Sequence, residues 1–174
     1  MTVRMEMRGN DSQNSERFRA IYAAHASLVR AVIYNICGGR DLDDLAQEAF
    51  LKVWRGLAGF RNDSQIGTWI YRVAANTALD HCRKKPMPVS EIELEELPGG
   101  VSADDDATLR DLVQKGMRRL SPEHRAVVTL CVFEELTTKE AAEALGSPEG
   151  TVKSRLHYAK GQMARFFENS GVKV

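Results

Sequence analysis

A short segment near the C-terminus carries side chains that are suited to contacting nucleic acid. From Gly150 to Met163 the chain contains three basic residues and no acid. Projected as a helix at about 100° per residue, Val152, Leu156, Ala159 and Met163 fall on one side. The opposite side presents Ser154, His157, Tyr158 and Gly161, flanked by Lys153, Arg155 and Lys160. Hydroxyl, imidazole and cationic groups can donate to base edges and phosphates.

The residues before this segment predict the element that positions it. LTTKEAAEALG has Thr137 and Glu140 at the spacing of a capping box and ends at Gly146. Ser147 as cap, with Pro148 at the first helical position, then predicts the last helix. Two short helices joined by a glycine-containing turn predict a helix-turn-helix. A merely solvated basic face is the alternative, but surface helices usually interleave both charges.

The rest of the chain also shows helical periodicity, and strand alternation is nearly absent. We predict an N-terminal helix capped by Ser15, a second capped by Asp41, and a third from Gly67 to Lys85, which ends before Pro86. Phe60 to Ile66 reads as a loop. In the second helix the predicted buried face comprises Leu42, Leu45, Ala46, Ala49, Phe50, Val53 and Trp54. A second capped helix in the C-terminal half is predicted from Ser121 and Pro122.

A change in composition divides the chain. From Pro86 to Asp111 there are eight acids, one base, and several Pro and Gly residues. Such a segment buries too little apolar surface to offset the entropy of ordering it. We therefore predict an all-α chain of two small helical domains, at 12–86 and 111–170, joined by a flexible acidic linker at 87–110.

Bulk composition restricts the possible functions. Of the 174 residues, 24 are Lys or Arg and 24 are Asp or Glu, so net charge gives no general attraction to nucleic acid or membranes. The three cysteines form no CxxC pair, which fits reduced thiols in a cytosolic protein. MTVRMEMRGN lacks a signal-peptide core, and no run approaches the roughly 20 apolar residues of a membrane span. His81 beside Cys82 is too small a set to predict a metal site.

Three longer segments together resemble a known family. They are LDDLAQEAFLKVWRGLAGF, GTWIYRVAANTALDHCRKK and LSPEHRAVVTLCVFEELTTKEAAEALGSPEGTVKSRLHYAK. In that order and spacing they resemble the group 4, or extracytoplasmic-function (ECF), sigma factors of the sigma-70 family of bacterial RNA polymerase. The resemblance covers roughly Phe18 to Arg165. The motifs D-L-x-Q-E-x-F, T-W-x-Y-R-x-A-x-N and G-T-V-K-S-R are much more specific together than singly.

The resemblance implies a transcription initiation factor that directs core RNA polymerase to specific promoters. Region 2, at 12–86, would dock on the polymerase and recognise and help to melt the minus-ten element. Region 4, at 111–170, would read the minus-thirty-five element through the helix-turn-helix. The implied partners are the clamp coiled coil and the flap of core RNA polymerase, promoter DNA, and an anti-sigma factor. The resemblance implies a cytoplasmic location and no cofactor, metal or direct membrane insertion, and it places the acidic linker in the path of the nascent RNA.

The same resemblance assigns candidate site residues. The polymerase-binding residues would be Asp44, Gln47, Glu48 and Lys52, a polar stripe that could otherwise be a plain solvated face. The minus-ten residues would be Phe60, Asn62, Asp63, Ser64, Arg72, Asn76, Asp80, Arg83 and Lys84. The minus-thirty-five residues would be Lys153, Ser154, Arg155, His157 and Tyr158. Trp69 and Tyr71 are interpreted as core or hydrogen-bonding residues.

Two other classes of protein remain as alternatives. A dimeric helix-turn-helix regulator would bind a palindrome without polymerase, using the N-terminal helices to dimerise or to bind an effector. A helical hydrolase could use His25 or His81. The sequence shows no nucleophile–base pair, glycine-rich phosphate loop or metal-ligand set, so we predict that the chain is not an enzyme.

Overall fold

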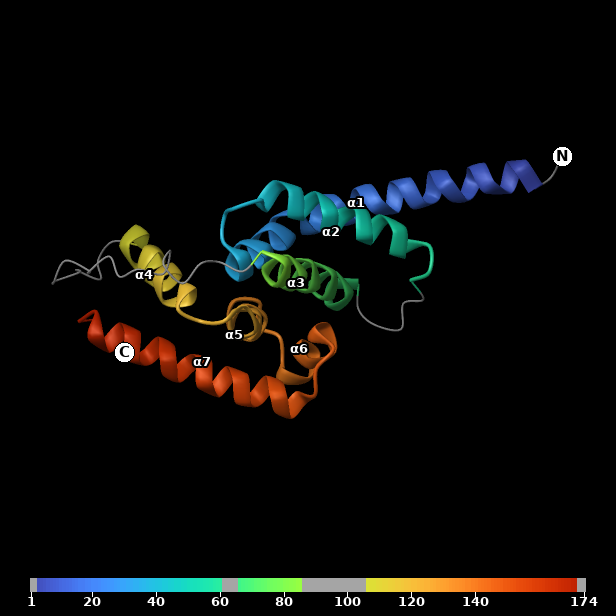
Figure 1. Cartoon of the computed structure of the whole chain (residues 1–174). Coiled ribbons are helices and arrows are strands. Elements are labelled where there is room, and N and C mark those ends of the chain that lie inside the picture. The colour runs from blue at the N-terminus through green and yellow to red at the C-terminus, as the bar shows by residue number, and fades with distance from the viewer. Residues whose placement is uncertain (1–2, 61–65, 86–105, 172–174) are drawn as a thin grey trace.

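The computed structural model describes residues 3–60, 66–85 and 106–171, with side chains at 14–60, 66–85 and 109–171. Within these ranges every regular element is a helix. In chain order they are α1 (Val3–Cys37), α2 (Leu42–Leu57), α3 (Ile66–Lys84), α4 (Asp106–Arg118), α5 (Pro122–Val128), the π-helix η2 (Thr129–Phe133), α6 (Thr138–Leu145) and α7 (Glu149–Asn169) (Figure 1). The prediction of an all-α fold is confirmed.

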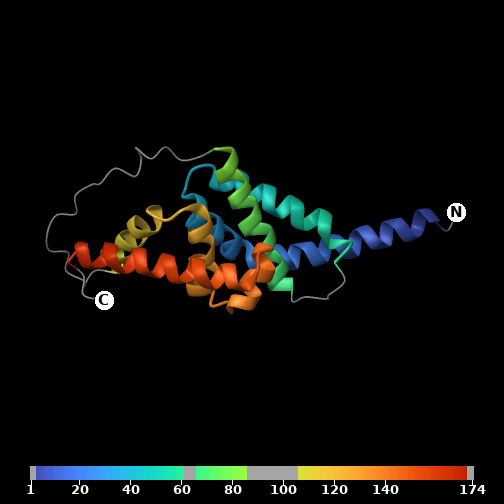
Figure 2. The same ribbon diagram turned by 60° about the horizontal axis from the view of Figure 1, so that its bottom comes forward.

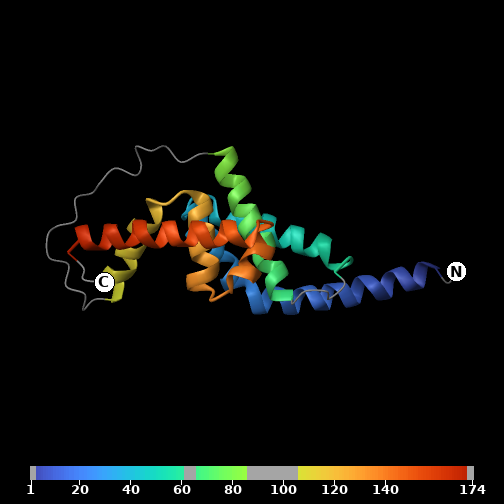
Figure 3. The same cartoon turned by 90° about the horizontal axis from the view of Figure 1, so that it is seen from below.

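The first three helices share a hydrophobic core with α5, η2, α6 and α7. α1 packs against α2 and α3, and α3 in turn packs against α5 and α6. One cluster of buried side chains runs across this boundary: it joins Val29, Val32, Ile33, Ile70 and Ala74 to Ala126, Val127, Leu130, Ala141 and Val152. α5 and α6 therefore lie between α3 and the long helix α7, which crosses them in the view from below (Figures 1 and 3). The sequence did not predict this packing of one half on the other.

Hydrogen bonds cross the same boundary. The hydroxyl of Tyr71 donates to a carboxylate oxygen of Glu134 at 2.9 Å. The guanidinium of Arg72 donates to the backbone carbonyl of Glu143, with Nη2 at 2.6 Å and Nε at 3.2 Å. Near the other end of the boundary, Gln114 Nε2 donates to Asn35 Oδ1 at 3.1 Å. The apolar contact is thus framed by polar contacts that fix how α4, η2 and α6 sit on α1 and α3.

Part of the predicted linker is helical. α4 begins at Asp106, so residues 106–110 form its first turns, while residues 87–105 of the predicted linker lie outside the described residues. α4 joins a second, smaller cluster in which Met117 and Leu120 pack with Val128 and Ala159. A rotated view shows α4 beside the C-terminal half of α7 (Figure 2). α4 is stabilised by burial of Leu112 and Met117 on its inner side.

Predicted helix starts are confirmed at two positions. Ser121 caps α5 by accepting a hydrogen bond from the His124 amide, and Thr137 and Glu140 form a complete capping box on α6. Gly146 ends α6 in the left-handed conformation at φ 60°, as a C-terminal glycine commonly does.

Two other predicted caps are wrong, and a third is right in position only. α1 begins at Val3 and continues through Ser15. α7 has Pro148 rather than Ser147 at the cap. Asp41 precedes α2 but has left-handed backbone angles (φ 57°, ψ 18°), and its side chain caps nothing. Instead its carboxylate lies 3.0 Å from Lys85 Nζ and 3.5 Å from His81 Nε2, because the left-handed turn directs it toward the end of α3. The hydrogen bond from Lys85 lowers the pKa of Asp41.

One stretch of α1, Asn14–Cys37, is long and apolar enough to cross a membrane when judged by length and composition alone. The structure gives a different reason for its composition. Val29, Val32, Ile33 and Ile36 within it have no exposed surface and lie in the core between α2, α3 and α5. A core helix that contacts several neighbours must be apolar around much of its circumference.

The packing predicts opposite effects for two glycine-to-alanine substitutions in helices. A Cβ at Gly56 would lie 2.6 Å from Cζ2 of Trp69, whereas a Cβ at Gly161 would meet no described atom within 4 Å. We expect Gly161→Ala to stabilise the chain by up to about 1 kcal/mol through helix propensity, and Gly56→Ala to destabilise it by about 1–2 kcal/mol. Urea unfolding followed by circular dichroism measures both. Shifts of the same sign would contradict the Trp69 contact.

The contact between Arg72 and Glu143 predicts a local effect on α6. In Arg72→Ala the backbone amides of Thr138–Leu145 should exchange hydrogen faster, on the order of fivefold, because the carbonyl that holds α6 to α3 no longer has its donor. Asn76→Ala, an exposed position about one turn further along α3, is the matched control and should leave exchange in α6 unchanged. Equal exchange in both variants and the parent chain would show that the contact does not hold α6.

Candidate nucleic-acid interface

The outer face of α7 is exposed in the way that its periodicity predicts. Val152 and Ala159 have no exposed surface, and Leu156 and Met163 are partly buried beside them. Lys153, Ser154, His157 and Tyr158 are exposed on the other side, while Arg155 is half-buried. Four of the five predicted minus-thirty-five residues therefore form one accessible surface.

The first turns of α7 are braced against α6. Thr138 at the start of α6 donates through Oγ1 to Glu149 Oε1 at 2.9 Å, and the same carboxylate lies 2.8 Å from Lys153 Nζ. The hydrogen bond from Lys153 lowers the pKa of Glu149. Both side chains of the ion pair are largely exposed, so the pair contributes little to stability and Lys153 can exchange Glu149 for a phosphate. Ser154 donates to the Thr151 carbonyl at 3.0 Å, which leaves its oxygen able to accept.

Tyr158 is tied to α5 through its ring. The ring lies 4.9 Å from that of His124, centroid to centroid, and its hydroxyl accepts a hydrogen bond from Gln162 Nε2 at 2.7 Å. Burial and the nearby charge of Arg155 lower the pKa of His124, so this imidazole stays neutral at pH 7. With 54% of its surface exposed, Tyr158 presents a fixed aromatic edge and a hydroxyl to solvent.

The residues predicted for the minus-ten element are spread over the α2–α3 connection and α3. Phe60 is half-buried against Trp69, with ring centroids 5.0 Å apart. Asn62, Asp63 and Ser64 lie outside the described residues. Asn76, Asp80, Arg83 and Lys84 are exposed along α3, and Arg83 forms a 2.9 Å ion pair with Asp80. Because this pair is at the surface, its cation can be transferred to a phosphate at small cost.

Arg72 differs from the other predicted minus-ten residues. Its guanidinium is bound to the Glu143 carbonyl of α6, as described above. The structure therefore brings Arg72 against the helix-turn-helix, although its side chain remains exposed as that of Asn76 does. In this arrangement α6 engages the Nε and Nη2 donors of Arg72.

The residues predicted to bind the polymerase lie on α2. Asp44, Gln47 and Glu48 are exposed. Lys52 is half-buried, with its Nζ 2.8 Å from Glu48 Oε1 and 3.1 Å from Thr77 Oγ1 of α3. The hydrogen bond from Lys52 lowers the pKa of Glu48. Lys52 thus joins α2 to α3, and the accessible part of the stripe is its N-terminal portion.

An apolar groove beside this stripe was missed by the sequence reasoning. Trp54, predicted to be buried, is 40% exposed, and Tyr22 and Leu51 are about as exposed or more so. Together with Phe18 and Phe50 they line a cavity of about 480 Å³ that Gln47 also borders. The signal available in the sequence was the spacing of Gln47, Leu51 and Trp54, at i, i+4 and i+7, which places an apolar pair on the polar face. Large apolar side chains gathered at a surface mark an interaction site.

Within the described residues, no group of three His, Cys, Asp or Glu side chains is placed to hold a metal ion. The exposed chemistry there consists of cations, carboxylates, hydroxyls, amides and apolar side chains. These groups can bind nucleic acid and protein.

Two segments of the chain match known protein families. Residues 21–86 match Sigma-70 region 2, and residues 110–163 match Sigma-70, region 4. RNA polymerase sigma-H factor of Pseudomonas aeruginosa is 34% identical over 147 residues, covering 76% of each chain. ECF RNA polymerase sigma factor SigM of Mycobacterium tuberculosis is 31% identical over 153 residues, covering 86% of this chain and 77% of that one.

Two solved structures share the fold. The sigma factor RpoE of Bartonella quintana, in complex with the anti-sigma factor NepR, aligns with a TM-score of 0.70 at 20% identity, covering 88% of this chain and 98% of that one. CnrH, in complex with the cytosolic domain of CnrY, aligns with a TM-score of 0.67 at 21% identity, covering 90% and 91%. On the two matched regions and the identity to curated relatives, the chain belongs to the ECF group of the sigma-70 family of RNA polymerase sigma factors.

Proposed function

We propose that this sigma factor docks on core RNA polymerase through α1 and α2, reads the minus-thirty-five element through α7, and engages the minus-ten element through α3 and the connection before it. The observation that carries the proposal is the accessible face of α7. Its hydroxyl, imidazole, phenol and ammonium groups point outward while the residues on the other side of the same helix are buried. A helix held by a capped partner helix and exposing such donors fits a major groove.

The docking surface combines the polar stripe and the apolar groove. Along α2, Gln47 lies between Asp44 and Leu51. Leu51 lines the apolar groove together with Trp54 and Tyr22. A helical coiled coil of the polymerase clamp would place apolar side chains into this groove and hydrogen-bond the amide at its edge. Interfaces of this kind derive most of their affinity from a few central aromatic and aliphatic residues.

The proposed minus-ten function rests on the polar and charged side chains exposed along α3. Asn76 can make paired hydrogen bonds to an exposed base, and the cations of Arg83 and Lys84 at the end of the helix suit phosphates. The tilted rings of Phe60 and Trp69 are in contact near the start of α3, where an extruded base could pack beside them. Asn62, Asp63 and Ser64 remain assigned to this element from the family resemblance.

The packed arrangement engages one of the predicted minus-ten residues. Arg72 donates through Nε and Nη2 to the Glu143 carbonyl of α6, and the shared core joins region 2 to region 4. We infer that docking on the polymerase separates the two regions and frees Arg72. The counterion contribution to DNA binding scales with the number of phosphates that a protein neutralises. A chain with a net charge of zero gains little from this contribution. The chain alone should therefore bind promoter DNA weakly.

We further propose that an anti-sigma factor controls this chain in the cytoplasm, where bacterial polymerase acts. Two proteins of the same fold have been solved in complexes, one with an anti-sigma factor and the other with the cytosolic domain of CnrY. Nucleotide addition is assigned to the polymerase.

The docking proposal predicts the effect of a double substitution. Gln47→Ala with Leu51→Ala should weaken binding to core polymerase by at least about tenfold, since each side chain lies in the centre of the surface. Helicity should not change, because both side chains are exposed. Biolayer interferometry against immobilised core enzyme measures the affinity. Glu168→Ala, exposed near the end of α7, is the control; undiminished binding by the double variant would remove α2 from the interface.

The DNA-reading proposal predicts an effect that depends on polymerase. Ser154→Ala and His157→Ala should each weaken promoter recognition by about 1–3 kcal/mol, because each substitution removes a hydrogen bond to a base edge. DNase footprinting of a minus-thirty-five duplex, with and without core enzyme, measures this. The parent chain should protect the element only with core enzyme. Tight protection of a palindrome by the chain alone would favour a dimeric regulator, and unchanged footprints in both variants would refute the assignment of α7.

A further inference from the structure

Two cysteines from different helices lie side by side at the boundary between the regions. Cys37 ends α1 and Cys82 lies near the end of α3, and their Sγ atoms are 3.2 Å apart. Cys37 is buried and is also 3.1 Å from the Ala78 carbonyl, while Cys82 is half-buried. Both thiols are free. A disulfide requires the sulfurs to approach to about 2.05 Å, a movement of roughly 1 Å that side-chain rotation can supply.

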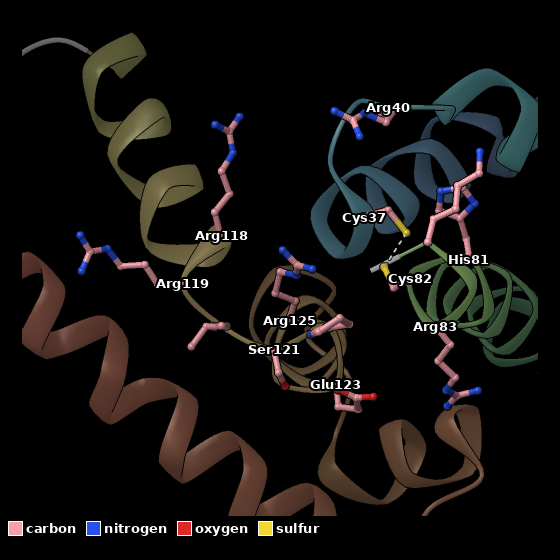
Figure 4. A pocket seen from close by; sticks show the side chains of 13 residues that line it. Cys37, Arg40, His81, Cys82, Arg83, Arg118, Arg119, Ser121, Glu123 and Arg125 are labelled. Atoms are coloured by element: carbon pink, nitrogen blue, oxygen red, sulfur yellow. Dashed lines mark hydrogen bonds between the residues drawn. The ribbon is translucent and has the colours of Figure 1, made fainter. Parts of the chain in front are cut away.

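A pocket gives small solutes access to this pair. It has a volume of about 480 Å³, lies between α1, α3 and α5, and is lined by both cysteines. Figure 4 shows Cys37 and Cys82 facing each other on one side of the pocket, with Arg125 of α5 beside them. The lining is strongly basic: besides Arg125 it includes Arg40, Arg83, Lys85, Arg118 and Arg119, and Glu123 is the one acid among the described residues that line it. Such surroundings favour a thiolate over a thiol.

Arg125 is the cation placed to favour that thiolate. Only 5% of its surface is exposed, and its Nε is buried without a hydrogen-bond partner among the described residues. The hydrogen bond from Cys37 and then the charge of Arg125 lower the pKa of Cys82 to about 7, against the effect of burial. The contact with Cys82 and then burial raise the pKa of Cys37, whose thiol also donates to the Ala78 carbonyl. The two cysteines are thus a reactive thiolate and a neighbouring protonated thiol.

We propose that Cys37 and Cys82 form a reversible disulfide when the chain meets a hydroperoxide. The Cys82 thiolate attacks the terminal oxygen, the O–O bond breaks, and the alkoxide leaves and takes a proton from water, giving a sulfenic acid on Cys82. Cys37 then attacks the Cys82 sulfur; the S–S bond forms, the S–O bond breaks, and hydroxide leaves with the Cys37 proton as water. The thiol pair loses two electrons, and the hydroperoxide gains them to become an alcohol and water. A small dithiol reverses the reaction.

The disulfide has a consequence for the packed arrangement. Cys37 and Cys82 belong to region 2, whereas Arg125 belongs to region 4. Oxidation removes the thiolate beside a buried guanidinium, and a buried cation without its anion is strongly unfavourable. α5 should therefore loosen from α1 and α3 in the oxidised chain. The regulatory consequence, that region 4 is released under oxidising conditions, rests on the proposed function. Formation of the disulfide does not rest on it.

The first experiment tests the chemistry on the full chain without polymerase. The reduced chain is titrated with hydrogen peroxide or cumene hydroperoxide, alkylated with N-ethylmaleimide, and analysed by intact mass and peptide mapping. We expect the number of alkylated thiols to fall from three to one, with Cys37 and Cys82 in one cross-linked peptide pair and Cys131 alkylated. The reaction rate should rise with pH through about 7 and then level off as Cys82 becomes fully ionised. Dithiothreitol should restore three alkylated thiols.

Matched variants separate the roles of the three cysteines. Cys131→Ser is the control, because burial raises the pKa of Cys131 and disfavours its thiolate; this variant should form the disulfide as the parent does. Cys37→Ser should stop at an oxidised Cys82, and Cys82→Ser should resist oxidation. Should either variant fail to fold, the peptide map of Cys131→Ser decides alone. A cross-link to Cys131, disulfide-linked dimers, or three alkylated thiols after treatment would each overturn the proposal.

The second experiment tests the coupling to α5. Hydrogen exchange is compared in the oxidised and reduced chain over Pro122–Val128. We expect exchange in this helix to become several-fold faster on oxidation and to return on reduction. In Arg125→Met the exchange of α5 should no longer respond to oxidation, and disulfide formation should need higher pH because Cys82 no longer has its cation. Unchanged exchange in the oxidised parent chain, or a full response in Arg125→Met, would refute the role of Arg125.

Discussion

The burial of α5 and α6 against α1 and α3 is the contact on which the rest of the structure depends. Val127, Leu130 and Ala141 have no exposed surface and share one buried cluster with Val32, Ile33 and Ala74. α5 and α6 are short helices, and short helices need such packing because propensity alone does not hold them in water. The capped turn before α7, and so the direction of its outer face, is positioned by this core.

The same contact separates two kinds of cation in this neutral chain. Its exposed cations are held loosely: Lys153 by Glu149 and Arg83 by Asp80, in surface pairs that DNA phosphates can replace. Arg72 and Arg125 are held differently, one by a backbone carbonyl across the boundary and the other by burial beside two cysteines. Their availability therefore depends on whether the two regions remain packed.

Much of the fold and part of the site could be predicted from local patterns. The capping box at Thr137 and Glu140 and the stripe of Val152 and Ala159 involve residues within one or two helical turns, so their spacing alone determines the local structure. The exposed side of α7 could be predicted from the same spacing, because it lies opposite the apolar stripe. The family motifs supplied the rest of the assignment, because several short segments at fixed spacing are more specific than any one helix pattern.

What depended on residues far apart in the chain was decided only by the tertiary structure. Asp41 has the type and position of a cap, yet it binds Lys85 and His81 because a left-handed turn directs it to α3. Trp54 lies in an apolar pattern but remains exposed, because the groove it lines has no described helix of this chain over it. Arg72 and the pair Cys37–Cys82 acquired their partners through contacts between residues 45 or more positions apart. Periodicity reports which side of a helix is apolar; it carries no information on which distant helix that side meets.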